Sequence, residues 1–242
     1  MIPIIDLLYE IDQKLNKVAN LQGQFIPDED KILYLNRNQI KLVLKKIGLN
    51  NNYQMGLDSF KKRYQDLEVL VVPFEQLEVT TTVGDLFNSS NADLTTTSQP
   101  YFLPLDAYIL GTRNNCKNRT LDVIELVKHG DIQTKLKSPH WTPSFEHQES
   151  LGTISNNKFY VYPDLKKTFE INSLYLSYLR YPKEMDIAGY QHLNGEASTD
   201  VDCELDGYLK NELLEMTIKE ISRSIGDQAN VQNSENGEKE SE

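Results

Sequence analysis

The sequence predicts an α+β fold, with N-terminal helices and a C-terminal helix around a central antiparallel β-sheet region. Two observations support this class. Apolar residues recur every three or four positions near both ends of the chain, which is typical of amphipathic helices. Between residues 75 and 182, apolar and polar residues alternate and tyrosine is frequent, as in β-strands. The 242 residues suffice for one large domain or two small ones with a real core.

The first expected element is a helix over residues 3–19. Pro3 suits a first helical turn, where its missing N–H is no loss. The apolar side chains that line one side of this helix are Ile4, Leu8, Ile11, Leu15 and Val18. We expect this side to face the chain's own core, and packing against a neighbouring subunit is the alternative.

A second helix is expected over residues 28–47, and both of its ends are marked. Pro27 and the acids at 28–30 lie at the positive end of the helix dipole, whereas Lys45 and Lys46 lie at the negative end. These acids could bind a cation, but helix capping explains them without one. The expected buried stripe consists of Leu33, Ile40, Val43, Leu44 and Ile47.

A third helix is expected over residues 57–72, and Pro73 is expected to end it. Its apolar positions, at helical spacing, are Phe60, Tyr64, Leu67 and Val71. A last helix is expected over residues 205–225, before an acidic segment at 227–242 that is almost without apolar side chains. Such a segment cannot bury enough surface to fold alone, so we expect a tail ordered only by contact with other subunits.

Residues 74–182 are expected to form a β-rich insertion. Strands are expected at 75–83, 101–113, 119–130, 151–162 and 168–181. The last two are joined by only five residues, "PDLKK", so we expect them to pair as a hairpin. Residues 84–100 are rich in Ser, Thr and Asn and are expected to form an exposed polar loop, and residues 131–139 a short helix. The expected parts of the chain are therefore 1–73, 74–182, 183–226 (a linker and the C-terminal helix) and 227–242.

The strand at 168–181 is partly apolar on both faces. One face carries Leu174, Leu176, Tyr178 and Arg180, and the other carries Tyr175, Ser177, Leu179 and Tyr181. We therefore expect both faces to be covered.

No catalytic, cofactor-binding or metal-binding motif stands out. The phosphate-binding, dinucleotide-binding, nucleophile-elbow and zinc-protease patterns are absent. His140 and His147 are not at a zinc-ligand spacing, and no cysteine or acid pair completes a site. Cys116 and Cys203 are expected to be reduced thiols, and no basic residue beside Cys203 would activate it. We therefore expect no enzymatic activity, cofactor or bound metal.

The net charge of −11 argues against a sequence-reading DNA-binding protein, because an acidic surface gains little from counterion release. The same charge is compatible with a wall along which DNA slides. The N-terminus does not resemble a signal peptide, and no apolar run has the roughly 18 residues that a membrane span needs. We therefore expect no membrane partner.

Tyrosines cluster within residues 159–182, and two interpretations stay open. Tyrosine favours strands and sheet edges, and it also favours protein–protein surfaces, where it combines a large contact area with a polar tip. The candidate subunit-interface residues are Tyr160, Tyr162, Tyr175, Tyr178, Tyr181, Leu214, Ile218, Ile221 and Ile225.

The order of the motifs resembles the head-to-tail connector proteins (adaptor or ring proteins) of tailed bacteriophages, most closely those of crAss-like, podovirus-type phages. The helix pair "ILYLNRNQIKLVLKKIG" and "GLDSFKKRYQDLEVLV" comes first. It is followed by "YFLPLDAYIL", by the tyrosine-rich "LYLSYLRYPKEMD" and by the closing "VDCELDGYLKNELLEMTIKEISRSIGD". The resemblance spans residues 28–227, and the polar stretch at 84–100 departs from it.

This resemblance implies a virion structural protein without catalytic residues. Copies of the chain, usually twelve, would form a ring between portal and tail, with the helices as the ring body and the genome in the channel. The implied partners are other copies of the chain, the portal protein, other tail or ring proteins and, without specificity, double-stranded DNA. The implied location is the virion neck, after assembly in the host cytoplasm.

A second class of function stays open, a monomeric carbohydrate-binding or small hydrolase-type domain. Its site would lie in the loops of the sheet, where Trp141, Tyr160 and Tyr162 could stack on sugar rings.

Overall fold

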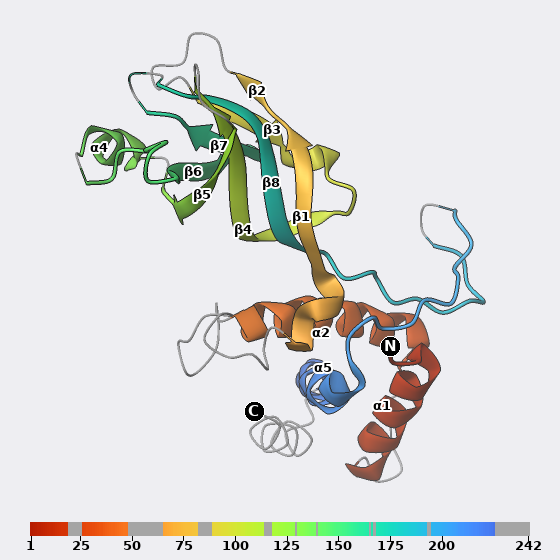
Figure 1. Cartoon of the computed structure of the whole chain (residues 1–242). Coiled ribbons are helices and arrows are strands. Elements are labelled where there is room, and N and C mark those ends of the chain that lie inside the picture. The colour runs from red at the N-terminus through yellow and green to blue at the C-terminus, as the bar shows by residue number, and fades with distance from the viewer. Residues whose placement is uncertain are drawn as a thin grey trace. The chain divides into compact units, whose positions relative to one another are not determined.

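The computed structural model describes ten stretches of the chain, which are residues 1–18, 26–47, 65–81, 89–113, 118–128, 130–138, 140–164, 166, 168–192 and 195–225. The chain divides into two units. The helical unit combines Met1–Leu70 with Pro182–Glu242, and the sheet unit is Val71–Tyr181. Figure 1 shows the strands gathered in one unit and the long helices in the other. The structure is thus mixed α and β, as the sequence predicted. The expected tail at 227–242 lies outside the described residues.

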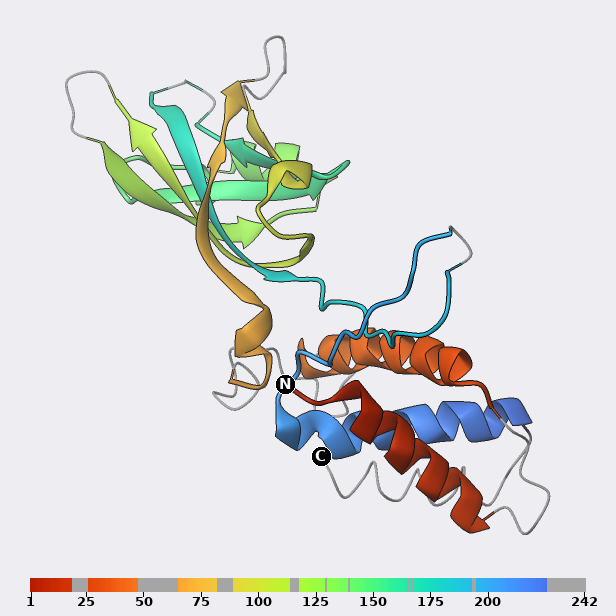
Figure 2. The same ribbon diagram turned by 90° about the vertical axis from the view of Figure 1, so that its right-hand side faces the viewer.

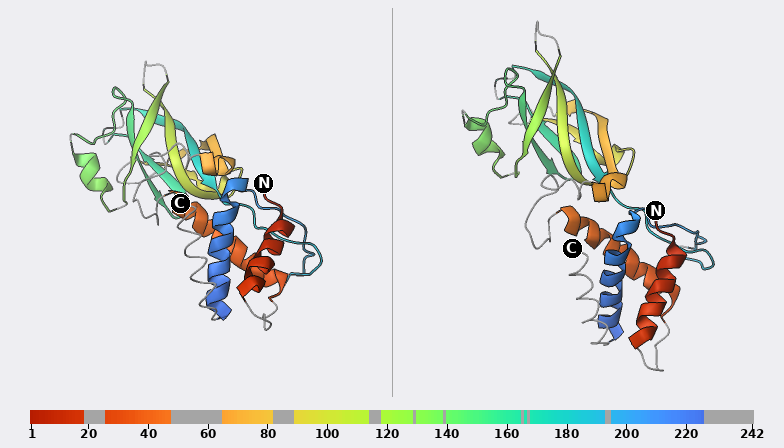
Figure 3. Two further views of the ribbon diagram at one scale, coloured as in Figure 1. Left: turned by 90° about the horizontal axis from the view of Figure 1, so that it is seen from below. Right: turned by 60° about the horizontal axis from the view of Figure 1, so that its bottom comes forward.

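The described residues of the helical unit include three long helices. They are α1 (Ile4–Val18), α2 (Asp28–Ile47) and α5 (Lys210–Ile225), with the short 3-10 turn η4 (Gly207–Leu209) leading into α5. Helix α5 packs against both α1 and α2, and Figures 2 and 3 show the three helices side by side. The predictions of helices at 3–19 and 28–47 are confirmed, and the one at 205–225 is confirmed from Gly207 onward.

Four members of the predicted stripe of α1 are buried, namely Ile4, Leu8, Ile11 and Leu15, and the side chain of the fifth, Val18, lies outside the described part of the structure. The predicted stripe of α2 is wrong, because only Val43 of its five members is buried and Leu33 is 57% exposed. The residues that α2 buries instead are Lys31, Ile32, Leu35, Asn38, Gln39, Leu42 and Val43. Polar members of this face are accommodated because Asn38 donates to Thr217, and Lys31 lies 2.6 Å from Asp12 and 2.8 Å from Asp28.

Residues 57–64 of the predicted third helix lie outside the described residues. The described part is helical only as far as the 3-10 turn η2 (Glu68–Leu70), and strand β1 (Val71–Glu78) begins at once. The helix therefore ends before residue 72, and Pro73 lies inside a strand. The pairing of β1 with β8 shifts register between Val72 and Glu75. Such an irregularity tolerates a residue that has no N–H to donate.

Among its described residues, the sheet unit contains one eight-stranded sheet. After β1 its strands are β2 (Thr80–Thr81), β3 (Ser90–Asp93), β4 (Tyr101–Thr112), β5 (Arg119–Leu126), β6 (Glu149–Ser155), β7 (Lys158–Tyr162) and β8 (Glu170–Arg180). The order is β1-β8-β4-β5-β6-β7-β3-β2. Only Val79 separates β1 from β2, so the two edge strands are one run of chain and the sheet closes on itself. All pairings are antiparallel, as predicted, except the parallel pair β5 and β6, which helix α4 (Ile132–Lys137) connects.

The predicted hairpin between 151–162 and 168–181 is wrong. Residues 149–162 are themselves a hairpin, in which β6 pairs with β7, whereas β8 pairs with β1 and β4. Its turn is Asn156–Asn157, with φ angles of 51° and 57°. This left-handed two-residue turn matches the twist of the strands, and asparagine accepts it readily.

The predicted polar loop at 84–100 is wrong for residues 90–96. Strand β3 pairs with β7, and the 3-10 turn η3 (Leu94–Thr96) follows it. Ala92 and Leu94 are buried, so single apolar residues within a polar stretch contribute to the core here. Residues 82–88 lie outside the described residues.

The closed sheet is filled tightly around Gly152, which leads to a stability prediction. A Cβ at position 152 would lie 2.8 Å from Val123 and 2.9 Å from Phe159. We expect Gly152→Ala to lower the free energy of unfolding by about 1–3 kcal/mol, the usual effect of overpacking a core. Denaturant unfolding followed by the fluorescence of Trp141, the single tryptophan, measures this in the sheet unit.

Gly130→Ala is the matched control, because a Cβ there would meet nothing within 4 Å. It should be neutral or slightly stabilising, since alanine restricts the unfolded chain. Equal stability for the two alanine variants would contradict the tight packing described here.

Candidate functional site

The outer face of strands β1, β8 and β4 is the candidate functional site. Strand β8 lies between the other two, and its Leu174, Leu176 and Tyr178 belong to the core cluster inside the closed sheet. Because side chains alternate along a strand, Tyr175 and Ser177 point to the outside. The prediction that both faces of this strand are covered holds in most positions, since only Tyr175 and Arg180 between 173 and 180 are not buried.

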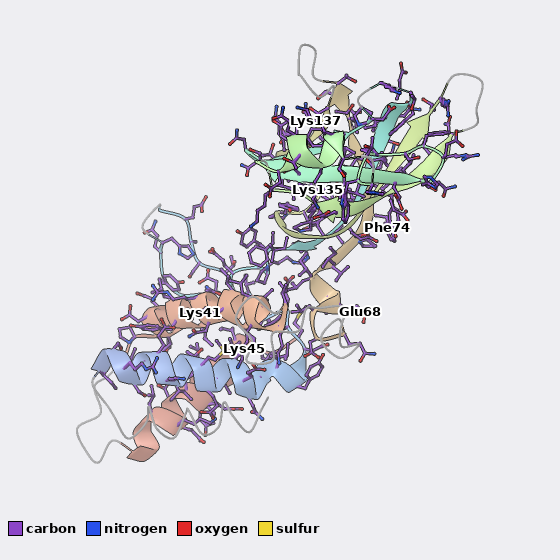
Figure 4. The ribbon with its side chains drawn as sticks, turned by 90° about the vertical axis from the view of Figure 1, so that its left-hand side faces the viewer. Lys41, Lys45, Glu68, Phe74, Lys135 and Lys137 are labelled. Atoms are coloured by element: carbon purple, nitrogen blue, oxygen red, sulfur yellow. The ribbon has the colours of Figure 1, made fainter. Side chains whose placement is uncertain are left out.

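Three aromatic side chains lie on this outer face, and we call Phe74, Tyr108 and Tyr175 the aromatic surface. Tyr108 of β4 pairs in register with Tyr175 of β8. The ring of Phe74 lies 5.3 Å from the ring of Tyr108, centroid to centroid. Phe74 is 54% exposed, and Figure 4 labels it on its strand. A hydrogen bond to Asp106 raises the pKa of the Tyr108 hydroxyl.

Phe74 is held outward at a conformational cost. Its φ of 41° is unusual for a bulky side chain and falls in the left-handed region. The irregular register after Val72 produces this conformation, and the N–H of Phe74 donates to the Ser177 hydroxyl at 3.1 Å. Strained backbone that also exposes a large aromatic ring is typical of functional positions, because packing alone would not select it.

The nine candidate interface residues of the sequence analysis do not form one surface. Five are buried within their own unit, namely Tyr162, Tyr178, Leu214, Ile218 and Ile221. Tyr160 and Tyr175 are half-buried, and Tyr181 and Ile225 are exposed. Of the nine, Tyr175 alone belongs to the aromatic surface. Tyr181 packs near the start of β4, with its ring 4.4 Å from that of Phe102.

Phe74 and Tyr108 were not singled out from the sequence. Tyr108 lies in a strand that was predicted, and its outward direction follows from alternation once the inner face is known. Phe74 could not be placed, because Pro73 beside it indicated the end of a helix. The single available signal was the proline itself, which within a strand implies an edge or a bulge.

A hydrogen-bond network around the Glu75 carboxylate lies on the inner side of the same strands. The Tyr178 hydroxyl donates to the Glu75 carboxylate at 2.7 Å, and the N–H and hydroxyl of Ser98 donate at 2.6 and 2.9 Å. Partial burial raises the pKa of Glu75, but these hydrogen bonds outweigh burial and leave the pKa below its ordinary value. Burial, followed by the bond to Glu75, raises the pKa of Tyr178.

The Glu75 network predicts a specific dependence of stability on pH. A carboxylate with a lowered pKa stabilises the folded chain above its unfolded pKa, and this stabilisation is lost as pH falls through the folded value. We expect Glu75→Gln to melt below the unsubstituted chain at pH 7. The difference should begin to shrink as pH falls below about 4.5, the ordinary pKa, and should disappear once pH passes the lower pKa of the folded Glu75 carboxylate, because Glu75 is then neutral like glutamine.

Melting curves between pH 7 and pH 3, followed by Trp141 fluorescence, measure this difference. Glu78→Gln is the control, because Glu78 is exposed on the same strand. A difference that stayed constant to pH 3 would contradict the role assigned to the Glu75 carboxylate.

The other residues considered for chemistry do not assemble into a site. His140 and His147 are both exposed, and no group of three His, Cys, Asp or Glu side chains among the described residues could hold a metal ion. Burial raises the pKa of the Cys203 thiol to about 11, which makes it a poor nucleophile at neutral pH. Cys116 lies outside the described residues.

One histidine belongs to a cluster that the sequence did not indicate. In the segment before α5, the Asp186 carboxylate accepts hydrogen bonds from the Tyr190 hydroxyl and the Ile187 N–H, and His192 Nε2 lies 3.1 Å away. Burial and the bond to Asp186 raise the pKa of Tyr190 to about 12. These contacts stabilise the irregular segment before α5, so the geometry supports a structural role for this cluster.

The residues considered for sugar stacking differ in how accessible their rings are. Tyr162 is buried in a small cluster with Leu136 and Leu151, so its ring has no free face. Trp141 is 47% exposed, but Lys135 lies 4.4 Å above its ring. A platform of three accessible rings is therefore not formed by Trp141, Tyr160 and Tyr162.

Comparison with protein-family models and with curated proteins yields no match for this chain. In the described part of the chain, no helix is both long enough and apolar enough to span a bilayer.

Proposed function

We propose that the chain is a subunit of an oligomeric ring that connects the portal of a tailed bacteriophage to its tail and forms part of the DNA channel. The observation that carries this proposal is the aromatic surface, in which a strained backbone exposes Phe74 beside two tyrosines. Aromatic side chains in this arrangement are typical anchors of protein interfaces. The order of the sequence motifs resembles that of connector proteins, and this resemblance is the reason for proposing a connector ring as the assembly.

The two units suit different tasks in such an assembly. The helices α1, α2 and α5 form the ring body, and the sheet unit presents the aromatic surface to a neighbouring protein of the neck. The portal and other tail or ring proteins are the partners proposed for that surface. The same resemblance is the basis for proposing twelve-fold symmetry, a location in the neck of the virion and assembly in the host cytoplasm.

The net charge of the chain supports the proposed role in a DNA channel. A net charge of −11 per copy, repeated around a ring, produces a strongly negative structure. Acidic side chains that face DNA avoid the phosphate contacts that would hold it, so the genome stays mobile during ejection.

A competition experiment tests the assembly role of the aromatic surface. Tagged chains with Phe74→Ser and Tyr108→Ser are produced in infected cells, and their share of purified particles is compared with that of the tagged unsubstituted chain. Loss of an interface anchor costs 2 kcal/mol or more, so we expect incorporation to fall by at least about 30-fold. Thermal unfolding should change little, because both rings lie on the surface.

Trp141→Ser is the matched control, since it removes an exposed aromatic ring elsewhere on the sheet unit. It should be incorporated as well as the unsubstituted chain. Normal incorporation of the Phe74→Ser and Tyr108→Ser chain would show that the aromatic surface has no role in assembly.

A further inference from the structure

The aromatic surface carries exposed acids as well as rings. In register across the sheet, Tyr175 of β8 opposes Tyr108 of β4, and Tyr108 in turn opposes Asp122 of β5. Asp106 lies two residues before Tyr108 on β4, so it points to the same face. Asp106 and Asp122 are both exposed. Two carboxylates therefore flank Tyr108, one along its own strand and one on the neighbouring strand.

Both carboxylates act on the Tyr108 hydroxyl. The hydrogen bond to Asp106 makes the largest contribution to raising the pKa of this hydroxyl, and the negative charge of Asp122 raises it further. A third acid, Glu78, is exposed on β1, the strand that also carries Phe74. The outer face of these strands is therefore aromatic and negatively charged.

The strands of this face supply no cation to balance the acids. β1 and β4 contain no Lys, Arg or His, and β5 and β8 contain one arginine each. Arg119, at the start of β5, lies over the ring of the core residue Phe145. Arg180, the last residue of β8, alternates onto the inner side with Tyr178. The lysines that follow β5 belong to the connection through α4, and Figure 1 shows α4 at the far end of the sheet unit from β1.

The chain itself shows how a ring and a carboxylate together hold a lysine. The ammonium group of Lys135 lies 4.4 Å above the ring of Trp141 and pairs with the Glu125 carboxylate. The negative face of an aromatic ring attracts a cation, and a carboxylate beside the ring adds an ion pair. The aromatic surface offers the same two kinds of group, with the rings of Phe74 and Tyr108 next to exposed carboxylates.

The charge of the whole chain favours a different protein as the source of the cation. At a net charge of −11, two copies of the chain repel each other on average, whereas a basic segment is attracted. We propose that the aromatic surface binds a segment of a neighbouring protein that bears Lys or Arg side chains, which lie against its rings and pair with Asp106 and Asp122. The inference rests on the proposed function and names the chemistry of the partner at the same surface.

Fluorescence anisotropy with a labelled peptide of alternating lysine and serine residues tests this inference. The full chain should bind the peptide and should not bind one with glutamate in place of lysine. Asp106→Asn combined with Asp122→Asn should weaken binding about tenfold, as when two exposed ion pairs are lost. Asparagine at position 106 keeps an oxygen that accepts the Ala107 N–H, so the fold is retained. Phe74→Leu removes the aromatic face but keeps an apolar side chain, and it should weaken binding about threefold.

Asp131→Asn combined with Glu170→Gln is the matched control. Both residues are exposed acids of the sheet unit outside this face, and the pair changes the net charge by the same amount. The control chain should bind the lysine peptide as well as the unsubstituted chain does. Equal weakening by both pairs of substitutions, or unchanged binding by the chain with Asp106→Asn and Asp122→Asn, would overturn the inference.

Sedimentation of the chain without peptide distinguishes a second copy from a different protein. Self-association that Asp106→Asn and Asp122→Asn abolish would make a second copy the occupant and would overturn the inference. A chain that is located in the neck ring but does not bind the lysine peptide would refute the inference alone. A chain that binds the peptide but is located outside the neck would refute the ring and not the binding of a basic segment.

Discussion

Phe159→Ala is expected to destabilise the sheet unit by about 3–5 kcal/mol, the range for truncating a buried aromatic side chain. Phe159 is fully buried and pairs in register with Ala92 of β3 and Ile154 of β6. The sheet closes on itself, so the side chains around the resulting cavity are held from several strands and cannot collapse into it. Urea unfolding followed by Trp141 fluorescence measures the loss in this unit.

Leu126→Ala is the control for this truncation, because Leu126 lies on β5 of the same sheet but is 45% exposed. Its effect should stay below about 1 kcal/mol, as for most surface substitutions. A loss of similar size for Phe159→Ala would mean that the sheet is not closed around a packed interior.

Glu212→Gln is expected to destabilise the helical unit by about 3 kcal/mol, as when a buried ion pair loses one partner. The side chain of Glu212, in the first turn of α5, is only 3% exposed. Its carboxylate lies 2.6 Å from Lys46 and 3.2 Å from Lys45 at the end of α2. After the substitution the described anion nearest to Lys46 is Asp66, at 3.9 Å. Denaturant unfolding followed by circular dichroism at 222 nm reports on the helices.

Glu220→Gln is the matched control, because Glu220 lies on the same helix and also pairs with two cations, Arg37 and Lys41. These partners are about half exposed, so water replaces the lost contacts and the effect should stay below about 1 kcal/mol. Equal effects of the two substitutions would contradict the burial that separates the two clusters.

The helices were predictable because their signals are local. Acids at 28–30 and lysines at 45 and 46 mark the ends of α2, and the spacing from Ile4 to Leu15 marks the buried side of α1. The choice between the two apolar stripes of α2 was not local. The stripe that is buried depends on residues far away in the sequence. Asp12 pairs with Lys31 and Thr217 accepts a hydrogen bond from Asn38, so these two polar side chains can be buried.

The sheet was predictable strand by strand but not in its pairing. The five residues between the predicted strands 151–162 and 168–181 suggested a hairpin, yet the two asparagines at 156 and 157 form the actual turn. The aromatic surface depends on the same long-range information. Its rings come from three strands, and one of them, Phe74, projects outward only because the register slips beside Pro73.

Imaging of an assembled phage particle by cryo-electron microscopy tests the central proposal most directly. The proposal predicts that this chain is found as a ring of identical subunits between the portal and the tail, with the genome channel through its centre. Contacts of Phe74 and Tyr108 with a neighbouring protein should be visible in the same reconstruction. Location of the chain in the capsid shell or in a receptor fibre would contradict the proposal.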